Sequence, residues 1–460
     1  MMPGRLLGRG SATCSTVTIG PRRRAGRLSE PAAVDRPHRL GGQVSHRRYR
    51  PDVVLAPAWV VQRPETVERL NGLLAQAGLG RPLSPPAART APGTELVELP
   101  VTGDPVAVAR ACRRLAGRSD AAVPECLPDY ECAAATVEDD ARVQRSLYPY
   151  YRASGRKSGH GTVAWLPAPE HVMPPKPPRR PASRFPAGRP VVALLDTGVR
   201  EHDWLVETDG DPYWQEAQDW TPARPIAEIA GQDSHGEESD GPDSGGPDSD
   251  GPDGGGPDGG GTDFGSHWGH GTFLAGLVRL AAPDARILSL RVMSDAGRVS
   301  DLNAAHALNW LADRVREGQR IDVVLTAFGR AGLGARQEME PVRAALRRLA
   351  DQGVPVVASA GNGGTDSPVY PAAFAADPTL TVVSVGARVS PTSRAPYSSH
   401  GVWVREWQEG TNVVSTMPLT TTPVAVQGGY AYWSGTSFAA ARYAGRLAQS
   451  MVPAPARLPD

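Results

Sequence analysis

From residue 189 onward, this 460-residue chain contains five short apolar runs that alternate with segments of helical spacing. Runs that are apolar at consecutive positions are typical of strands buried on both faces of a sheet. Their alternation with helices predicts a parallel sheet covered on both sides, so we expect an α/β domain of the doubly wound class. The runs are 191–195, 286–290, 321–325, 354–358 and 381–385, and the helices are expected around 270–280, 299–317 and 338–352.

Residues 51–131 show a different order of elements. Strand, helix, strand, helix and strand follow one another within about 80 residues, which predicts a small α+β domain. Pro64 and Glu65 suit the first turn of one helix, and Asp104 suits the cap of the other. The helices are expected at 64–74 and 105–115, and the extended segments at 52–56, 94–99 and 121–130.

Three further segments lack the pattern of a packed core. Residues 1–50 are rich in Arg and Gly and predict a disordered basic tail. Residues 132–188 are rich in Pro and Arg and predict a linker. An acidic Gly/Pro/Asp repeat at about 232–263 predicts a solvated insertion, with weak calcium binding by its Asp residues as the alternative. The α/β domain is then expected to span residues 189–455.

Charge and cysteine content limit the function classes. The formal net charge is zero, which argues against nucleic-acid or membrane-surface binding through overall charge. No cysteine has a histidine at metal-ligand spacing. A Cys112–Cys126 disulfide, a Cys126–Cys132 disulfide and free thiols all fit the sequence, and Cys14 lies far from the others.

The N-terminus also bears on location. It carries charge throughout and lacks the apolar core of a signal peptide. The sequence contains no run of about 18 apolar residues, the length that a transmembrane helix needs. As written, the chain is therefore predicted to be cytoplasmic without a membrane span, and secretion is the alternative if the true start codon lies upstream.

Three separate stretches carry the residue types of nucleophilic catalysis by serine. Asp196 ends a predicted strand, His270 begins an apolar helix within Gly-His-Gly-Thr, and Ser437 begins an Ala-rich helix within Gly-Thr-Ser. A serine hydroxyl needs a neighbouring base, and the base needs a carboxylate that holds its tautomer. Helix N-termini add unpaired N–H groups that can face a developing oxyanion. We therefore expect these three side chains to meet at one edge of the parallel sheet.

These stretches resemble the signature blocks of the subtilisin-like serine proteases (subtilases), which read D-T/S-G, H-G-T-x-x-A-G and G-T-S-x-A-A-P in this chain order. The resemblance spans about residues 189–450. It implies a serine endopeptidase that acts on polypeptides through an acyl-enzyme, in which Asp196 orients the base, His270 is the general base and acid, and Ser437 is the nucleophile. It implies no cofactor, and a structural calcium ion is not readable from the sequence.

Two more blocks resemble the same family. Residues 356–362 look like its oxyanion block, which implies that the Asn362 side-chain amide and the Ser437 backbone N–H are the two donors. Residues 325–329 look like the strand that pairs with substrate backbone. The resemblance therefore implies substrate contacts at Ala327, Phe328 and Gly329.

Several positions depart from the family pattern. Ala441-Arg442 stands where the family has Pro and a variable residue, Thr326-Ala327 lacks the usual serine, and Gln408-Glu409-Gly410 replaces A-P-G. These departures make a catalytically silent, binding subtilase fold the alternative to an active protease. An esterase of the α/β-hydrolase class is disfavoured, because that class requires G-x-S-x-G with the serine first in chain order.

Two N-terminal features complete the interpretation. A first Gly-His-Gly-Thr copy contains His160, but it lies in the predicted linker before Asp196, and we expect it to have no catalytic role. The domain at 51–131 is similar to the inhibitor-like propeptide of subtilases, with 124–130 where the cleft-binding strand would end. This similarity implies an intramolecular inhibitor and chaperone that self-cleavage removes between about Tyr130 and Arg189, and a separate targeting or partner-binding domain is the alternative.

Overall fold

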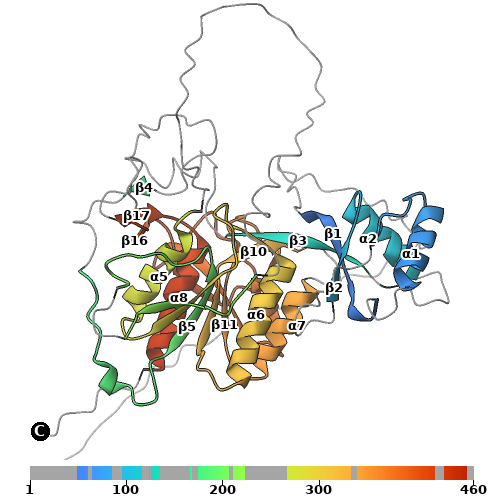
Figure 1. Cartoon of the computed structure of the whole chain (residues 1–460). Coiled ribbons are helices and arrows are strands. Elements are labelled where there is room, and N and C mark those ends of the chain that lie inside the picture. Colours follow the sequence, from blue (N-terminus) through green and yellow to red (C-terminus); the bar gives the residue numbers. More distant parts are fainter. Residues whose placement is uncertain are drawn as a thin grey trace, which may run out of the picture. The chain divides into compact units, whose positions relative to one another are not determined.

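The computed structural model of the chain is drawn in Figure 1, and its described residues all belong to one compact unit, Arg47–Asp460. Residues 1–48 of the predicted tail, the acidic insertion and the segment with His160 lie outside the described residues. The described residues are 49–60, 65–84, 96–116, 124, 126–134, 166–167, 175–206, 211–222, 267–332, 339–419 and 429–452.

The main sheet has eight strands in this part of the chain. They are β5 (Val191–Asp196), β6 (Trp214–Glu216), β7 (Arg286–Arg291), β9 (Val323–Thr326), β11 (Val356–Ser359), β13 (Val382–Ser390), β14 (Ser393–Arg394) and β15 (Glu406–Glu409). The five predicted strands are all present and pair in parallel, in the order β13-β11-β9-β5-β7. The short strands β6 and β15 add parallel pairs, and β14 adds an antiparallel pair.

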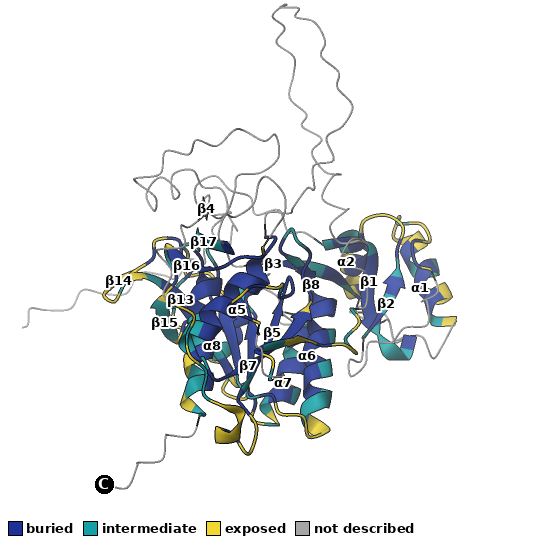
Figure 2. Cartoon of the chain, turned by 60° about the vertical axis from the view of Figure 1, so that its left-hand side comes forward, coloured by how far each residue is buried: buried dark blue, intermediate teal, exposed yellow. Residues whose placement is uncertain are grey.

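Helices cover both faces of this sheet, as Figures 1 and 2 show. They are α5 (His270–Ala281), α6 (Asp301–Arg316), α7 (Glu340–Ala350) and α8 (Thr436–Ser450). Successive strand residues point to opposite faces. Val192 and Leu194 accordingly lie in one buried cluster with α5 and α8 residues, whereas Ala193 and Leu195 lie in another with α6 and α7 residues. This arrangement confirms the predicted doubly wound α/β class.

The chain order along the sheet reverses at β5, because β7 lies on one side of it and β9 on the other. Ligand sites in such sheets form beyond the carboxyl ends of the strands at this reversal. Asp196 is the last residue of β5, and Ala327 follows β9 directly. α5 begins against the turn after β5, where a Cβ at Gly271 would lie 2.3 Å from the carbonyl oxygen of Gly198. The glycine at position 271 therefore lets the first turn of α5 reach the end of β5.

The N-terminal part contains the five elements that the sequence predicts. They are β1 (Tyr49–Pro57), α1 (Glu65–Gln76), β2 (Leu96–Pro100), α2 (Pro105–Ala116) and β3 (Leu127–Ala134). β1 pairs antiparallel with β2 on one edge and with β3 on the other. Val54, Leu70 and Leu99 are buried in its own apolar cluster. Cys112, Cys126 and Cys132 are not in disulfide bonds, so neither disulfide that the sequence allowed is formed.

β3 extends beyond the domain end that the sequence predicted at residue 131. It pairs antiparallel with β8 (Arg298–Ser300) and with β10 (Phe328–Ala331), which belong to the α/β part. β10 pairs in turn with β12 (Val369–Tyr370). Strands of two to four residues have no detectable period in a sequence, which is why β8 and β12 were not predicted.

A buried ion pair accompanies this pairing. Arg50 of β1 is 1% exposed and donates to Glu98 at 2.7 Å and to Asp129 of β3 at 2.9 Å. The other carboxylate oxygen of Asp129 accepts the backbone N–H of Leu302, in the first turn of α6, at 3.1 Å. Burial raises the pKa of Asp129 to about 6, although the charge of Arg50 opposes this shift. The small domain is thus joined to α6 by a carboxylate at the helix N-terminus, where negative charge is favourable.

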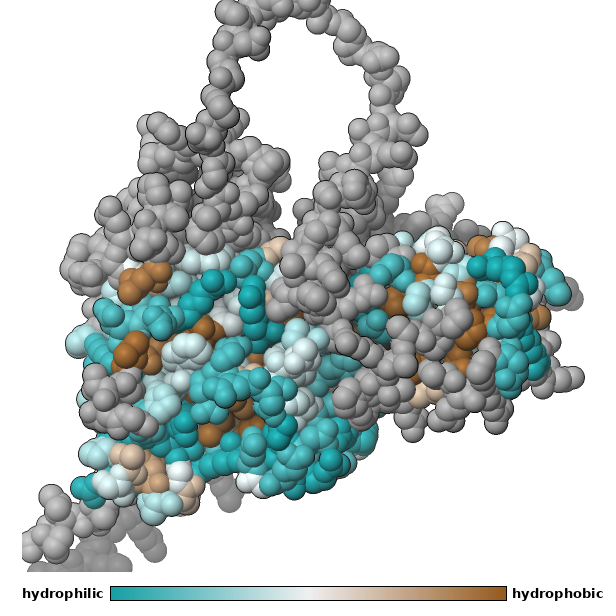
Figure 3. Space-filling view, viewed as in Figure 1, coloured by the Kyte–Doolittle hydropathy of each residue, from teal (hydrophilic) through white to brown (hydrophobic). Residues whose placement is uncertain are grey.

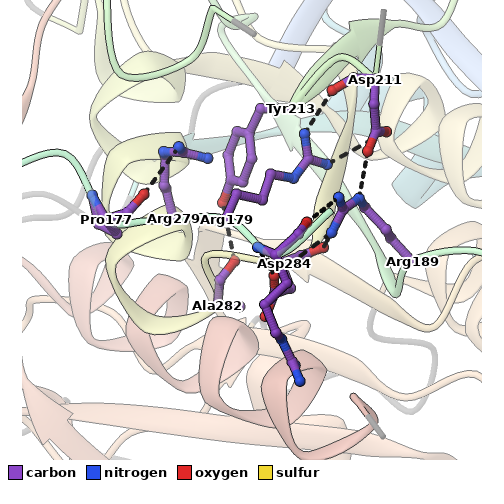
Figure 4. Close-up of polar contacts among 9 residues, drawn as sticks. Pro177, Arg179, Arg189, Asp211, Tyr213, Arg279, Ala282 and Asp284 are labelled. Carbon is purple, nitrogen blue, oxygen red and sulfur yellow. Dashed lines mark hydrogen bonds and ion pairs between the residues drawn. The ribbon is translucent and has the colours of Figure 1, made fainter. Parts of the chain in front are cut away.

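The last part of the predicted linker is fastened to the α/β part by arginines (Figure 4). Asp284 accepts from the backbone N–H and Nε of Arg180 at 2.8 and 2.9 Å, and Asp211 accepts from Arg189 at 2.6 Å. Arg279 of α5 donates to the carbonyl of Pro177 at 3.2 Å. These contacts lie at the C-terminal end of α5, about 15 Å along the helix from His270. They hold the chain after Pro177 to the α/β part independently of β3.

A second part of the predicted linker is also ordered. β4 (Leu166–Pro167) pairs antiparallel with β17 (Tyr430–Trp433), which pairs on its other edge with β16 (Val413–Thr416). The range 132–188 is therefore not a plain linker, because its described residues include two strands and an anchored segment.

The surface of the face in Figure 3 is mostly hydrophilic with small separate apolar patches. The large apolar side chains that are exposed among the described residues are Val206, Val389, Val402 and Leu419. Scattered exposure of this kind is normal for a folded protein. The helices that the structure describes include none with the length and apolar character to cross a membrane.

Candidate active site

Asp196 and His270 are in direct contact at the carboxyl end of the sheet. Oδ1 of Asp196 lies 2.7 Å from Nδ1 of His270, and both side chains are 0% exposed. The same oxygen accepts the backbone N–H of Thr197 at 2.8 Å, and the Thr197 hydroxyl accepts the N–H of Gly271 at 3.0 Å. Thr197 therefore links the end of β5 to the first turn of α5. This network fixes the imidazole with Nδ1 toward the carboxylate and leaves Nε2 on the other side of the ring.

Aromatic rings surround the His270 imidazole. Trp433 lies edge-to-face at 5.4 Å between ring centroids, and Phe438 lies at 5.6 Å. A second histidine, His267, lies at 5.8 Å and is buried. Burial lowers the pKa of His267 to about 3, with smaller contributions from His270 and Arg298, so this neighbour stays neutral. Nε2 of His270 is buried without a hydrogen-bond partner among the described residues.

Ser437 is the second residue of α8 and is 0% exposed. Its hydroxyl donates to the carbonyl of Ala327 at 3.0 Å, and not to His270. Phe438, the next residue, packs against the His270 ring, so the serine and the imidazole belong to the same buried site. The structure thus makes the Asp–His contact of the predicted triad, whereas the Ser437 hydroxyl donates to the backbone of Ala327.

Asn362 follows β11 and is held by the residue before the serine. Its Oδ1 accepts both the backbone N–H and the hydroxyl of Thr436, each at 3.0 Å. Because the amide oxygen is used in this way, the Nδ2 donors point elsewhere, and within the described residues Nδ2 is buried without a partner. The backbone N–H of Ser437 is one of the first N–H groups of α8, which have no intrahelical acceptor. Two donors are therefore available beside the serine.

The predicted substrate strand is already paired in this structure. Phe328 lies opposite Ala134 of β3, and Gly329 lies opposite Ala133. Gly329 is required by close packing on the other side, because a Cβ there would lie 2.9 Å from the carbonyl oxygen of Tyr370. Ala327 is the residue whose carbonyl accepts the Ser437 hydroxyl. The chain's own β3 thus lies along the strand that was assigned to substrate.

Some residues of the site were not singled out from the sequence. They are Thr197, Thr436 and Trp433. Their nearness in the sequence to Asp196 or Ser437 was the only indication that they could belong to the site. His202 is a further buried histidine of the α/β part. It is 2% exposed, its Nε2 lies 3.0 Å from the carbonyl of Gly429, and its Nδ1 accepts the N–H of Trp204. His202 therefore has a structural place outside the Asp196–His270 pair.

Comparisons with known proteins give one family. A family model described as "Subtilase family" matches residues 188–456. Subtilisin BL from Lederbergia lenta is 29% identical over 189 residues, which are 39% of this chain and 62% of that protein. Thermitase from Thermoactinomyces vulgaris is 28% identical over 187 residues, which are 38% of this chain and 59% of that protein. The match thus spans about three fifths of the length of these relatives.

Solved structures give similar matches. Fervidolysin from Fervidobacterium pennivorans, described as a keratinolytic enzyme related to subtilisin, is 18% identical with a TM-score of 0.48, covering 88% of this chain and 55% of that chain.

Proposed function

Because the chain belongs to the subtilase family, we propose that it is a serine endopeptidase that hydrolyses peptide bonds through Asp196, His270 and Ser437. The observation that carries the proposal is the buried contact of 2.7 Å between Asp196 and His270, with Nε2 of the imidazole free of partners among the described residues. A neutral imidazole with Nδ1–H on a carboxylate has a basic Nε2, which is the state that a general base needs.

In the proposed reaction, the Ser437 hydroxyl leaves the Ala327 carbonyl and turns to Nε2 of His270. Its oxygen attacks the peptide carbonyl carbon while Nε2 takes the proton. The imidazolium then gives this proton to the departing amine, which breaks the C–N bond and leaves an acyl-enzyme. A water molecule then attacks the acyl carbon while Nε2 takes a proton from it. The imidazolium returns this proton to the Ser437 oxygen as the acyl–serine bond breaks, which releases the acid product and restores the serine. Asp196 remains ionised throughout and compensates the charge of the imidazolium.

The oxyanion of each tetrahedral intermediate would be held by Asn362 and the Ser437 N–H. Thr436 supports this role, because it donates two hydrogen bonds to the amide oxygen of Asn362. The Nδ2 group, at the other end of the same amide, is thereby left to donate to an oxyanion. Donors that are oriented before the reaction stabilise developing charge without a cost of reorganisation. No cofactor enters this mechanism.

A fluorophosphonate probe tests the proposed function directly. The probe reacts only with a serine that a neighbouring base activates, and we expect a single covalent adduct, which peptide mapping by mass spectrometry locates at Ser437. The protein is first incubated until its N-terminal domain has been cleaved off, because β3 pairs along β10. Protein that neither cleaves itself nor becomes labelled, even after its N-terminal domain is removed with a second protease, would favour a catalytically silent binding protein instead.

We further propose that the N-terminal domain is an intramolecular inhibitor. Its support is the position of β3, which is antiparallel to β8 and to β10 at once, as an added strand is when a peptide binds by β-augmentation. The buried pairing of Arg50 with Asp129, and the contact of Asp129 with α6, hold the same strand from its other end. Polypeptide substrates would then compete with β3 for this place.

Self-cleavage is the corresponding prediction. The described part of β3 ends with Ala134 opposite Phe328, and the carbonyl of the residue before Phe328, Ala327, contacts Ser437. The bond that is cut is therefore expected shortly after Ala134. We expect wild-type protein to cut itself near the Ala135–Thr136 bond, which N-terminal sequencing and intact mass would detect. The Ser437→Ala variant should keep its full mass under the same conditions. Equal full-length masses for both proteins would instead indicate a permanently attached domain.

A further inference from the structure

One β3 side chain enters the α/β part at a place that the mechanism does not use. Cys132 lies opposite Val299 of β8 and is 1% exposed, whereas the next residue, Ala133, is exposed. This alternation is that of a strand with one face on the protein and the other toward solvent. Cys132 belongs to the main buried cluster, together with Val299 and Phe328 of the two flanking strands. Its side chain thus occupies a buried site between β8 and β10, which is here called the Cys132 site.

Two charged side chains, Asp301 and Arg330, adjoin the Cys132 site. The thiol of Cys132 donates to Oδ1 of Asp301 at 3.4 Å, and Asp301 is 3% exposed. Arg330 of β10 donates to the same carboxylate, at 2.8 Å from Nη2 and at 3.3 Å from Nε. Burial, and then the charge of Asp301, raise the pKa of the Cys132 thiol, so the sulfur keeps its proton and remains a donor. The Cys132 site therefore combines apolar neighbours, Val299 and Phe328, with one hydrogen-bond acceptor, the carboxylate of Asp301.

From this geometry we propose that Asp301, oriented by Arg330, is a specificity-determining residue that selects substrates with a hydrogen-bond donor at the position of Cys132. The proposal rests on the proposed function, in which a substrate takes the place of β3. With cleavage after Ala135, the selected position is the fourth residue before the scissile bond. Substrates with Cys, Ser or Thr there would be preferred over substrates with an apolar side chain of the same shape.

The physical reason is the cost of burying a carboxylate against an apolar group. A substrate strand between β8 and β10 removes Asp301 from water, as β3 does here. A donor side chain replaces part of the lost hydration, and an apolar one does not. The selection is therefore expected to follow hydrogen bonding and not volume.

Thr and Val test this distinction, because their side chains have the same shape and differ in one hydroxyl. Two peptides are taken from the chain's own sequence, Tyr-Glu-Xaa-Ala-Ala-Ala-Thr-Val, with Xaa as Thr or Val in place of Cys132. Both are mixed in one tube with full-length protein that has been allowed to process itself. The ratio of their rates of loss, followed by mass spectrometry, is the ratio of their kcat/KM values. We expect the Thr peptide to be lost about tenfold faster, since the acceptor is charged but already shared with Arg330.

Asp301→Asn should reduce this ratio to below about threefold, because the acceptor is then a neutral amide oxygen. Asp313→Asn is the matched control, since it makes the same change on the same helix and also removes a carboxylate that pairs with an arginine, Arg348. The control should keep the wild-type ratio. If Asp301→Asn does not fold, the wild-type ratio still decides the question.

The other outcomes separate the two proposals. Equal loss of the peptides, or faster loss of the Val peptide, overturns the role of Asp301 and leaves the proposed protease intact. If the fluorophosphonate labels the protein at Ser437 but neither peptide is lost, the Cys132 site does not bind substrate, and the inference is overturned. Loss of neither peptide by protein that also stays unlabelled overturns the proposed function, and the inference falls with it.

Discussion

Ser437→Ala is expected to lower kcat for peptide hydrolysis by about 10⁶-fold, the loss that removal of the serine causes in subtilisin itself. The alanine has no oxygen to attack the carbonyl, so the acyl-enzyme route is closed and only binding and the oxyanion donors remain. The fold should persist, because position 437 lies within a helix and the substitution removes one hydrogen bond, to Ala327. We expect a change of about 1 kcal/mol in the free energy of unfolding.

Hydrolysis of a fluorogenic peptide, with protein concentration set by absorbance, measures this effect. To compare enzymes without their N-terminal domains, a trace of active wild-type protein first cleaves the variant and is then inhibited with the fluorophosphonate. Ser450→Ala is the matched control, since it changes a serine at the other end of the same helix, where the hydroxyl donates to the carbonyl of Leu447. The control should keep wild-type kcat. A Ser437→Ala variant that retains even one hundredth of wild-type activity would remove the serine from the mechanism.

The α/β part was predictable because its signals are strong and local. The central strands are buried on both faces, so each appears in the sequence as a mostly apolar run, such as 191–195 before Asp196. The motif residues stand at the ends of these elements, where the parallel topology brings distant parts of the chain to one edge. The contact of Asp196 with His270, 74 residues apart, was therefore expected from the sequence.

The contacts between the small domain and the α/β part were not predictable in the same way. β8 and β10 have three and four residues, and each pairs with a strand more than 160 residues away. Neither length nor periodicity indicates such a pairing in a single sequence. The buried pair of Arg50 with Asp129 gives no sequence signal either, because a charged residue in a strand is ordinarily read as exposed. The sequence therefore placed the end of the small domain at residue 131, whereas β3 continues to Ala134.

The hydrogen bond that the Ser437 hydroxyl makes is a further property that the sequence does not predict. The Gly-Thr-Ser motif predicts where the hydroxyl lies, but it does not predict which acceptor the hydroxyl uses, and in this structure that acceptor is the carbonyl of Ala327. In this structure β3 pairs along β10, and the serine donates to the residue that precedes β10. A change of acceptor to His270 is therefore a step that we expect when a scissile peptide occupies the site.

Asp196→Asn is expected to lower kcat by about 10⁴-fold, as the corresponding change does in another Ser-His-Asp protease. Asp196 and His270 are both 0% exposed, so water cannot compensate the charge that His270 gains when it takes the serine proton. A neutral amide removes this compensation from the transition state. An amide turned with its N–H toward Nδ1 would in addition place the imidazole proton on Nε2, where the base must be unprotonated.

The measurement is again kcat for a fluorogenic peptide, together with the rate of fluorophosphonate labelling, which should fall in parallel because both reactions need the same base. Asp351→Asn, at the exposed end of α7, is the control and should leave both rates unchanged. If the variant kept kcat within tenfold of wild type, the imidazolium would not need its carboxylate, and Asp196 would be a structural residue that caps the end of β5. If labelling stayed fast while hydrolysis fell, the carboxylate would act after the serine has reacted, in the transfer of the proton to the leaving amine.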